Sequence, residues 1–152
     1  MTGTALPLVD AILYLIPLDV DLQTFQDALC RLEEAVLERG GDPANAYLRD
    51  AVLLRFYIAL EASAAALGRY LDAVYFRPNA RVLSPRQLFR HAARPGLISD
   101  CEAWLRPVEN RNRIVHAYSE PMADAIAANA AAFAADARAL LNALEQGIAD
   151  GG

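Results

Sequence analysis

Lysine is absent from the sequence, and all 14 strongly basic residues are arginines. Against 19 acidic residues they leave a formal net charge of −5, but this charge is unevenly distributed. Residues 77–113 contain eight arginines and three acids, a local charge of +5, whereas the remainder carries six arginines and sixteen acids, a charge of −10. Such an asymmetry allows one face of the protein to attract an anion while the whole chain stays acidic.

Cysteine is scarce as well, because Cys30 and Cys101 are the only two. They form neither a disulfide framework nor a CxxC or Cys/His cluster, so we expect no metal and no cofactor, and a reducing cytoplasm suits the chain. Residues 5–18 are apolar, but they are too short to span a bilayer and are interrupted by an aspartate and prolines. No basic residue precedes Arg31, which disfavours a secretory signal. We therefore interpret residues 1–20 as an apolar tail, either mobile or covering a partner surface, without a membrane role.

The alternation of apolar and polar residues that is typical of half-buried strands is also missing. Alanine, the strongest helix former, contributes 31 residues to a composition that is 55% hydrophobic. A length of 152 residues suits one domain. We therefore predict an all-α protein, an up-and-down bundle of four or five helices that occupies residues 21–146.

Helices are expected where apolar residues follow helical spacing between caps and breakers. Asp42-Pro43 and Ser84-Pro85 each resemble an N-cap followed by proline at the first helical position. The predicted helices are 21–39, 43–75, 84–93, one from about 99 through 118 that Pro107 is expected to bend, and 121–145.

One stretch, RNRIVHAY at residues 111–118, gathers four chemically capable side chains: Arg111, Asn112, His116 and Tyr118. On a regular helix Asn112 and His116 share a face, while Arg111 and Tyr118 form a neighbouring row. Arginine binds phosphate oxygens with a planar fork and histidine titrates near neutral pH, so together they suit a phosphodiester. A structural explanation exists for each residue alone: His116 would interact with the helix dipole, Arg111 would pair with an acid, and Asn112 would cap a loop.

Metal-free cleavage of RNA requires one group to activate the ribose 2′-hydroxyl and another to protonate the leaving 5′-oxygen. The motif supplies a single histidine per chain. This chemistry therefore predicts a two-fold dimer that places two copies of the motif around one groove.

Further arginines are candidates for contacts with the phosphates of RNA. Arg86, Arg90 and Arg94 fall at i, i+4 and i+8 on one predicted helix, and Arg113 lies within the motif. A solvated helix face is the alternative explanation for this row. The second histidine, His91, is interpreted as a surface or packing residue rather than a catalytic one.

The motif fits the R-x4-H-x-Y form of the HEPN motif, and residues 21–146 resemble the nucleotidyltransferase substrate-binding proteins, the helical HEPN partners of minimal nucleotidyltransferases. Four segments carry the resemblance in the family's order: LCRLEEAVLE, LRDAVLLRFYIALEASAAAL, SPRQLFRHAARPGLI and CEAWLRPVENRNRIVHAYSE. The resemblance implies a four- or five-helix bundle, a homodimer and a cognate minimal nucleotidyltransferase. Some related pairs are toxin–antitoxin modules, in which the HEPN member is a metal-independent ribonuclease that its partner silences by adding AMP to the motif tyrosine.

On this chain the resemblance assigns phosphate binding to Arg111, orientation to Asn112, proton transfer to His116 and AMP acceptance to Tyr118. The main hypothesis is therefore an RNA-cleaving toxin silenced by AMPylation. The alternative is a non-catalytic substrate-binding subunit of a two-component nucleotidyltransferase. The chain departs from the family where Glu61 is followed by ASAAAL instead of the frequent Trp-Lys pair, and it has no nucleotidyltransferase signature of its own, such as Gly-Ser followed by paired aspartates.

Overall fold

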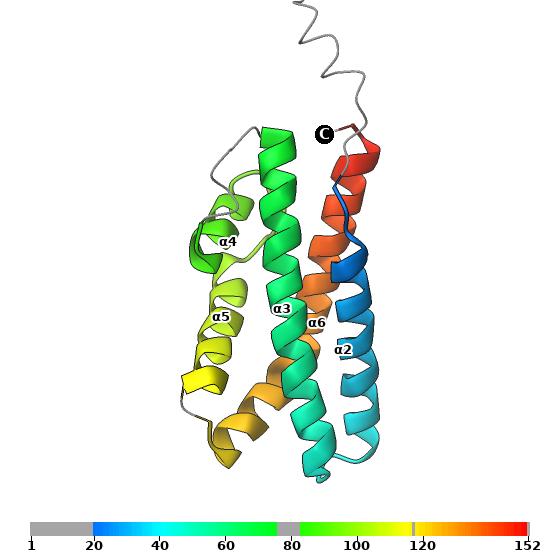
Figure 1. The fold of residues 1–152 in the computed structure, drawn as a ribbon, viewed down its shortest axis with the longest axis vertical. Coiled ribbons are helices and arrows are strands. Elements are labelled where there is room, and N and C mark those ends of the chain that lie inside the picture. The colour runs from blue at the N-terminus through cyan, green and yellow to red at the C-terminus, as the bar shows by residue number, and fades with distance from the viewer. Residues whose placement is uncertain (1–19, 76–82, 117, 152) are drawn as a thin grey trace, which may run out of the picture.

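The computed structural model describes residues 20–75, 83–116 and 118–151, and every regular element within these ranges is an α-helix. The expected all-α bundle is confirmed. The helices are α2 (Gln23–Gly41), α3 (Ala46–Tyr75), α4 (Pro85–Ala93), α5 (Cys101–His116) and α6 (Glu120–Ala149) (Figure 1). The predicted apolar tail lies, apart from Val20, outside the described residues.

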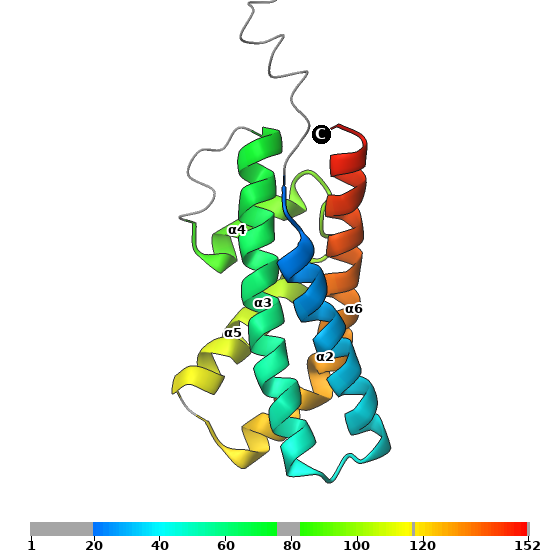
Figure 2. The ribbon, with the colours of Figure 1, turned by 45° about the vertical axis from the view of Figure 1, so that its right-hand side comes forward.

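The long helices α2, α3 and α6 pack against one another, while α4 and α5 follow each other along the opposite flank of α3 (Figures 1 and 2). Helix α6 runs obliquely, so that it contacts α5 near its own start as well as α2. Helix α3 touches all four other helices. By length and composition α3 alone among the described helices is apolar enough to cross a membrane, but most of that stretch is buried inside the bundle.

An aromatic series ties the second half of the chain together. The ring of Phe56 on α3 meets Phe133 on α6 edge to face at a centroid distance of 4.9 Å. Phe133 in turn meets Trp104 on α5 at 5.5 Å, and Trp104 stacks on Phe89 of α4 at 4.6 Å. Such pairs contribute about 0.5–1.5 kcal/mol each beyond the burial of their area. They fix α5, the helix that carries the motif, against α4 and α6, and they fix α6 in turn against α3.

Of three predicted helix starts, those at Ser84 and Pro121 are confirmed and the one at residue 43 is wrong. Ser84 caps α4: its hydroxyl oxygen accepts from the Gln87 amide at 3.3 Å, and the Gln87 side chain accepts from the Ser84 amide at 2.9 Å. Pro121 lies in the first turn of α6, as expected. Helix α3 begins at Ala46 instead of residue 43, because Asn45 and not Asp42 accepts from the first free amides of the helix.

Candidate functional site

Helix α5 carries Arg111, Asn112 and Arg113 and ends at His116. Tyr118 therefore lies in the connection to α6 and not on the helix. The predicted helical row from Arg111 to Tyr118 is wrong for this reason. The capping of α6 by Ser119, whose hydroxyl oxygen accepts from the Met122 amide at 3.4 Å, requires extended backbone just after Tyr118.

Arg111 is engaged within the fold. Its guanidinium forms an ion pair with the Glu61 carboxylate on α3 and donates to Asn112 Oδ1 at 3.0 Å. Its buried Nε has no hydrogen-bond partner in the described part of the chain. Glu61 and Asn112 thus occupy the fork that was expected to hold a phosphate. The pairing of Arg111 with an acid, one of the two explanations left open by the sequence, is what the structure shows.

His116 and Asn112 lie one turn apart in the last two turns of α5. His116 is exposed, whereas Asn112 is half-buried and its carbonyl oxygen orients Arg111. A cationic histidine in the last turn of a helix interacts favourably with the helix dipole. The imidazole is therefore accessible to a ligand or to a second protein chain.

The side chain of Tyr118 is 52% exposed, but its hydroxyl is held by α3. The hydroxyl donates to Asp50 Oδ1 at 3.1 Å and accepts from Arg49 Nη2 at 3.3 Å. Partial burial, followed by the hydrogen bond to the Asp50 carboxylate, raises the pKa of the Tyr118 phenol above its usual value. Tyr118 is accordingly a protonated hydroxyl at neutral pH, with a carboxylate positioned to accept its proton.

Arg49 is a site residue that the sequence analysis missed. Its side chain is only 7% exposed and contacts Asp50, Glu120 and Asp124. These carboxylates, Glu120 first, raise the pKa of the guanidinium above its ordinary value, so Arg49 is permanently charged. Arg49 precedes the core residues Val52 and Phe56 by three and seven positions, which puts an arginine on the buried face of α3. This spacing from the core residues is the sequence signal that could have identified Arg49 as a buried arginine.

The two ends of the motif are anchored at separate places on α3. Arg111 contacts Glu61 and Tyr118 contacts Asp50. Asp50 and Glu61 are eleven residues apart, which is about 16 Å along a helix. One phosphate group cannot contact both Arg111 and the Tyr118 hydroxyl of the same chain in this arrangement.

The arginine row is only partly free for phosphates. Arg86 pairs with Glu109 on α5 at 3.3 Å. Arg90, Arg94 and Arg113 are exposed. His91 is half-buried on α4, and its buried Nδ1 has no hydrogen-bond partner among the described residues. Within those residues no group of three or more His, Cys, Asp or Glu side chains is arranged to hold a metal ion.

The protein is an all-α bundle in which α5 and the connection after it carry the polar motif. Glu61 and Asp50 on α3 hold the two ends of this motif. The chain matches the family described as nucleotidyltransferase substrate binding protein like over residues 20–146, and it belongs to that family. The predicted membership is therefore confirmed.

Two solved structures are similar to the chain. The crystal structure of a protein from Thermus thermophilus is 29% identical, with a TM-score of 0.69, and the match covers 79% of this chain and 98% of that one. A protein from Haemophilus influenzae, whose structure is described as revealing the fold of a substrate-binding domain of a nucleotidyltransferase, is 22% identical with a TM-score of 0.73. That match covers 82% of this chain and 99% of the other, and it shows a shared fold. No match was found among curated proteins.

Proposed function

We propose that this chain is the non-catalytic substrate-binding partner of a separate, minimal nucleotidyltransferase in the cytoplasm. The observation that carries the proposal is the family match over residues 20–146. The sequence also lacks Gly-Ser followed by paired aspartates, so the transfer chemistry has to come from another chain. Of the two hypotheses raised by the sequence, the family description favours the binding subunit over the RNA-cleaving toxin.

The surface offered to this partner is a stripe on α3, formed by Tyr47, Leu54 and Ile58, which are 88%, 61% and 46% exposed. Their spacing of seven and four residues places them on one side of the helix. Contiguous exposed apolar side chains mark interaction surfaces. Asp50, which accepts the Tyr118 hydrogen bond, lies on the same helix between Tyr47 and Leu54, so we propose that a protein bound to the stripe also contacts Tyr118.

Sedimentation velocity of the chain mixed with a minimal nucleotidyltransferase from the same organism tests this surface. The wild-type chain should form a complex, and Leu54→Asp should weaken it at least about tenfold because a charge would be desolvated in the contact. Leu37→Asp on α2 is the matched control, since Leu37 is an exposed leucine on another helix, 79% exposed against 61% for Leu54. Equal binding by all three chains would exclude the stripe, and no complex for the wild type would contradict the proposed function.

We further propose that Tyr118 is itself an acceptor that the chain presents. In the reaction the phenol oxygen attacks the α-phosphorus of ATP, the bond from that phosphorus to the bridging oxygen breaks, and pyrophosphate leaves. The phenol proton passes to Asp50, which already accepts the hydroxyl hydrogen bond at 3.1 Å. Around Tyr118 the single positive charge of Arg49 is paired with three carboxylates, so this region is negatively charged overall. The positive charge that binds the triphosphate of ATP therefore has to come from the partner.

Intact-mass measurement after incubation with the nucleotidyltransferase and ATP tests this acceptor. The wild type should gain the mass of AMP, and Tyr118→Phe should not. Tyr75→Phe is the control, because Tyr75 is an exposed tyrosine at the far end of α3. Asp50→Asn should slow the transfer without preventing the complex. Mass gain on Tyr118→Phe would refute the assignment while leaving the binding role intact.

The metal-independent endoribonuclease is a second candidate, favoured by the exposure of His116 on the same helix as Arg111 and Asn112. Because Arg111 is paired with Glu61 in the single chain, cleavage would require a homodimer or a rearrangement that frees it. RNA cleavage in EDTA that is lost in His116→Ala and kept in His91→Ala would support this candidate. Intact RNA after incubation with the pure, unmodified protein would dismiss it.

RNA binding by the exposed arginines can be separated from cleavage. Affinity should fall as salt rises, because counterions are released when arginines contact phosphates. Arg90→Ala together with Arg94→Ala should flatten this dependence. Binding that ignores salt would identify the row as a solvated helix face.

A further inference from the structure

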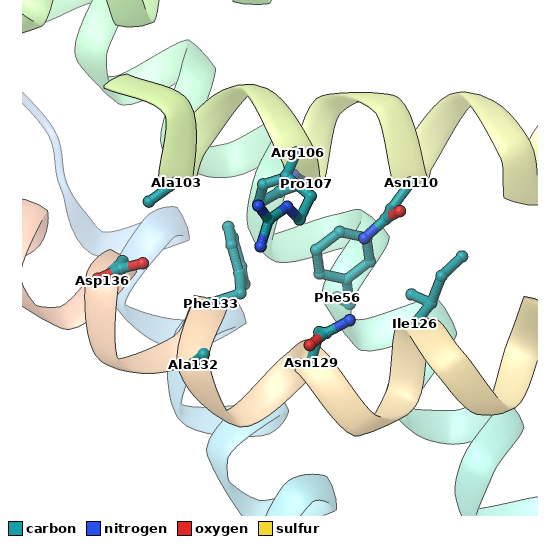
Figure 3. A pocket seen from close by; sticks show the side chains of 10 residues that line it. All are labelled: Phe56, Ala103, Arg106, Pro107, Asn110, Ile126, Asn129, Ala132, Phe133 and Asp136. Atoms are coloured by element: carbon teal, nitrogen blue, oxygen red, sulfur yellow. The ribbon is translucent and has the colours of Figure 1, made fainter. Parts of the chain in front are cut away.

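A cavity of about 320 Å³ opens between α3 and α4. It is larger than the recess between α5 and α6 in Figure 3, which measures about 110 Å³ and is lined by the buried rings of Phe56 and Phe133. A dry cavity of about 150 Å³ holds one benzene molecule. By that measure the cavity beside α4 has room for roughly twelve non-hydrogen atoms, whereas the recess has room for less than one ring.

The middle of the cavity is apolar. Its apolar lining consists of Ala64, Ala65 and Gly68 on α3 and of Leu83, Pro85 and Leu88 in and just before α4. Alanine and glycine extend little from the helix surface, so the side chains on the α4 side do not meet them and a space remains. Such a surface favours an apolar group, because burial removes both from water.

A charged residue lies at each end of the α3 lining. Glu61, Ala65 and Arg69 all line the cavity and follow one another at intervals of four residues, so they form one row along the helix. The two charged residues are eight positions apart, about 12 Å along the axis. The ion pair with Arg111 offsets the negative charge of Glu61. The end at Arg69 is therefore the positive end of the cavity.

Arg69 has no counter-charge in the described part of the chain. Its Nη2 donates to the Asp21 backbone carbonyl at 3.0 Å, and it forms no ion pair with another described residue. The side chain is half-buried, and its buried Nε has no hydrogen-bond partner among those residues. Removing a guanidinium from water without partners and a counter-charge is unfavourable. An anion bound beside Arg69 would supply both.

We infer that this cavity binds a small monocarboxylate with an apolar body, roughly twelve non-hydrogen atoms in all. The carboxylate pairs with Arg69, whose planar fork matches two carboxylate oxygens, and the apolar body lies between Ala65 and Leu88. Since Glu61 is already balanced by Arg111, a single negative charge on the ligand is enough. The inference does not rest on the proposed function, because neither the exposed stripe of α3 nor the motif residues line the cavity.

Calorimetric titration with 4-phenylbutyrate tests the ligand class, because this probe joins a carboxylate to an apolar body of suitable size. 4-Phenylbutyramide is the matched neutral probe, since it has nearly the same shape without the charge. The carboxylate should bind saturably at one site, and the amide should bind at least about tenfold more weakly. No saturable binding of the carboxylate, or equal affinity for both probes, would overturn the inference.

Substitution of Arg69 tests the charged end. Arg69→Gln should weaken 4-phenylbutyrate at least about tenfold and leave the weaker binding of the amide unchanged. Arg90→Gln is the matched control, because Arg90 is an exposed arginine on α4 that does not line the cavity. A loss of the same size for both probes, or equal losses in Arg69→Gln and Arg90→Gln, would contradict the pairing of the carboxylate with Arg69.

Two further variants test the apolar middle. Ala65→Phe places a ring in the cavity, whereas Ala73→Phe places the same ring on an exposed position of α3 outside it. The first should weaken 4-phenylbutyrate at least about tenfold and the second should not. Nuclear magnetic resonance of the ¹⁵N-labelled wild type locates the probe without any substitution, and the amide signals of Ala65 and Gly68 should shift. Equal losses in the two variants, or shifts centred on Asn129 in the recess of Figure 3, would refute this site.

Discussion

At the scale of single residues, Gly147 on α6 lies directly against Tyr70 on α3. A Cβ at position 147 would lie 1.9 Å from the Tyr70 hydroxyl oxygen and 2.8 Å from the ring carbon that bears it. Tyr70 is buried, and this burial raises the pKa of its hydroxyl. A glycine in a helix interior ordinarily costs roughly 0.5–1 kcal/mol relative to alanine. At position 147 the close approach of the Tyr70 side chain explains why the helix contains a glycine.

Gly147→Ala should therefore destabilise the fold. Overpacking costs about 1–3 kcal/mol, and the better helix propensity of alanine returns about 1 kcal/mol of it. Urea unfolding should show the lower stability, and Tyr70→Phe in the same chain should restore part of it by removing the hydroxyl oxygen. Gly40→Ala is the control, because a Cβ there meets no atom within 4 Å. Equal effects at Gly147 and Gly40 would refute the close approach.

Asp136 predicts a pH dependence of stability. Its burial, with a smaller contribution from Asp100, raises the pKa of the carboxyl above its usual 3.8. The folded state therefore holds the proton more tightly than the unfolded chain does, and stability is lost as the pH rises through the folded-state pKa. Asp136→Asn should be more stable than the wild type at pH 7, and the difference should shrink as the pH falls through the raised folded-state pKa and be lost by about pH 3.8. A difference that is the same at every pH would contradict this cause.

The residues of the motif were identified from the sequence, but their contacts were not. Local spacing shows that Arg111 and Asn112 are neighbours, whereas the Glu61 partner comes from a residue fifty positions away. Arg49 was missed because an arginine between tyrosine, leucine and aspartate looks like an ordinary surface residue. Only the register of the buried face of α3 distinguishes it.

At the scale of helices, local signals predicted element type well and ends less well. The spacing of Val52, Phe56 and Leu60, each four residues after the last, correctly predicts helix α3, and all three side chains are buried. Its start was wrong because Asp42-Pro43 forms a turn, in which the Asn45 amide donates to the Asp42 carbonyl at 3.1 Å. The sequence alone does not decide between Asp42 and Asn45, three positions apart, because both residue types are strong N-caps.

Helix α4 is short, so its cap should matter. Ser84→Ala removes the hydroxyl that accepts from Gln87 and should cost about 1 kcal/mol. Thermal unfolding measures this change. Ser99→Ala is the matched control, since Asp100 and not Ser99 accepts from the first amides of α5. A loss for Ser99→Ala as large as that for Ser84→Ala would show that the capping box is not the cause.

At the scale of the whole molecule, the sequence and the family resemblance together predict a homodimer that buries α5 near its two-fold axis. Val115 near the end of α5 is 56% exposed and lies one turn from Arg111. An apolar side chain in that position is a candidate for the centre of such a contact. Which chains associate depends on surfaces that no local pattern specifies, so the dimer stays a prediction.

Sedimentation equilibrium of the chain alone checks the dimer. The wild type should sediment as a dimer at micromolar concentration, and Val115→Asp should shift it to the monomer because a charge would be buried at the contact. Leu37→Asp should leave the mass unchanged. A wild-type monomer would remove the composite histidine site and with it the strongest argument for RNA cleavage.

The measurement that tests the central claim most directly is nucleotidyl transfer from labelled ATP by a minimal nucleotidyltransferase from the same organism, with and without this chain. If the chain is the substrate-binding partner, label should be incorporated only when both proteins are present. Leu54→Asp should reduce the incorporation at least about tenfold and Leu37→Asp should not. Incorporation that is equal without the chain, or absent in a mixture that forms a stable complex, would contradict the account.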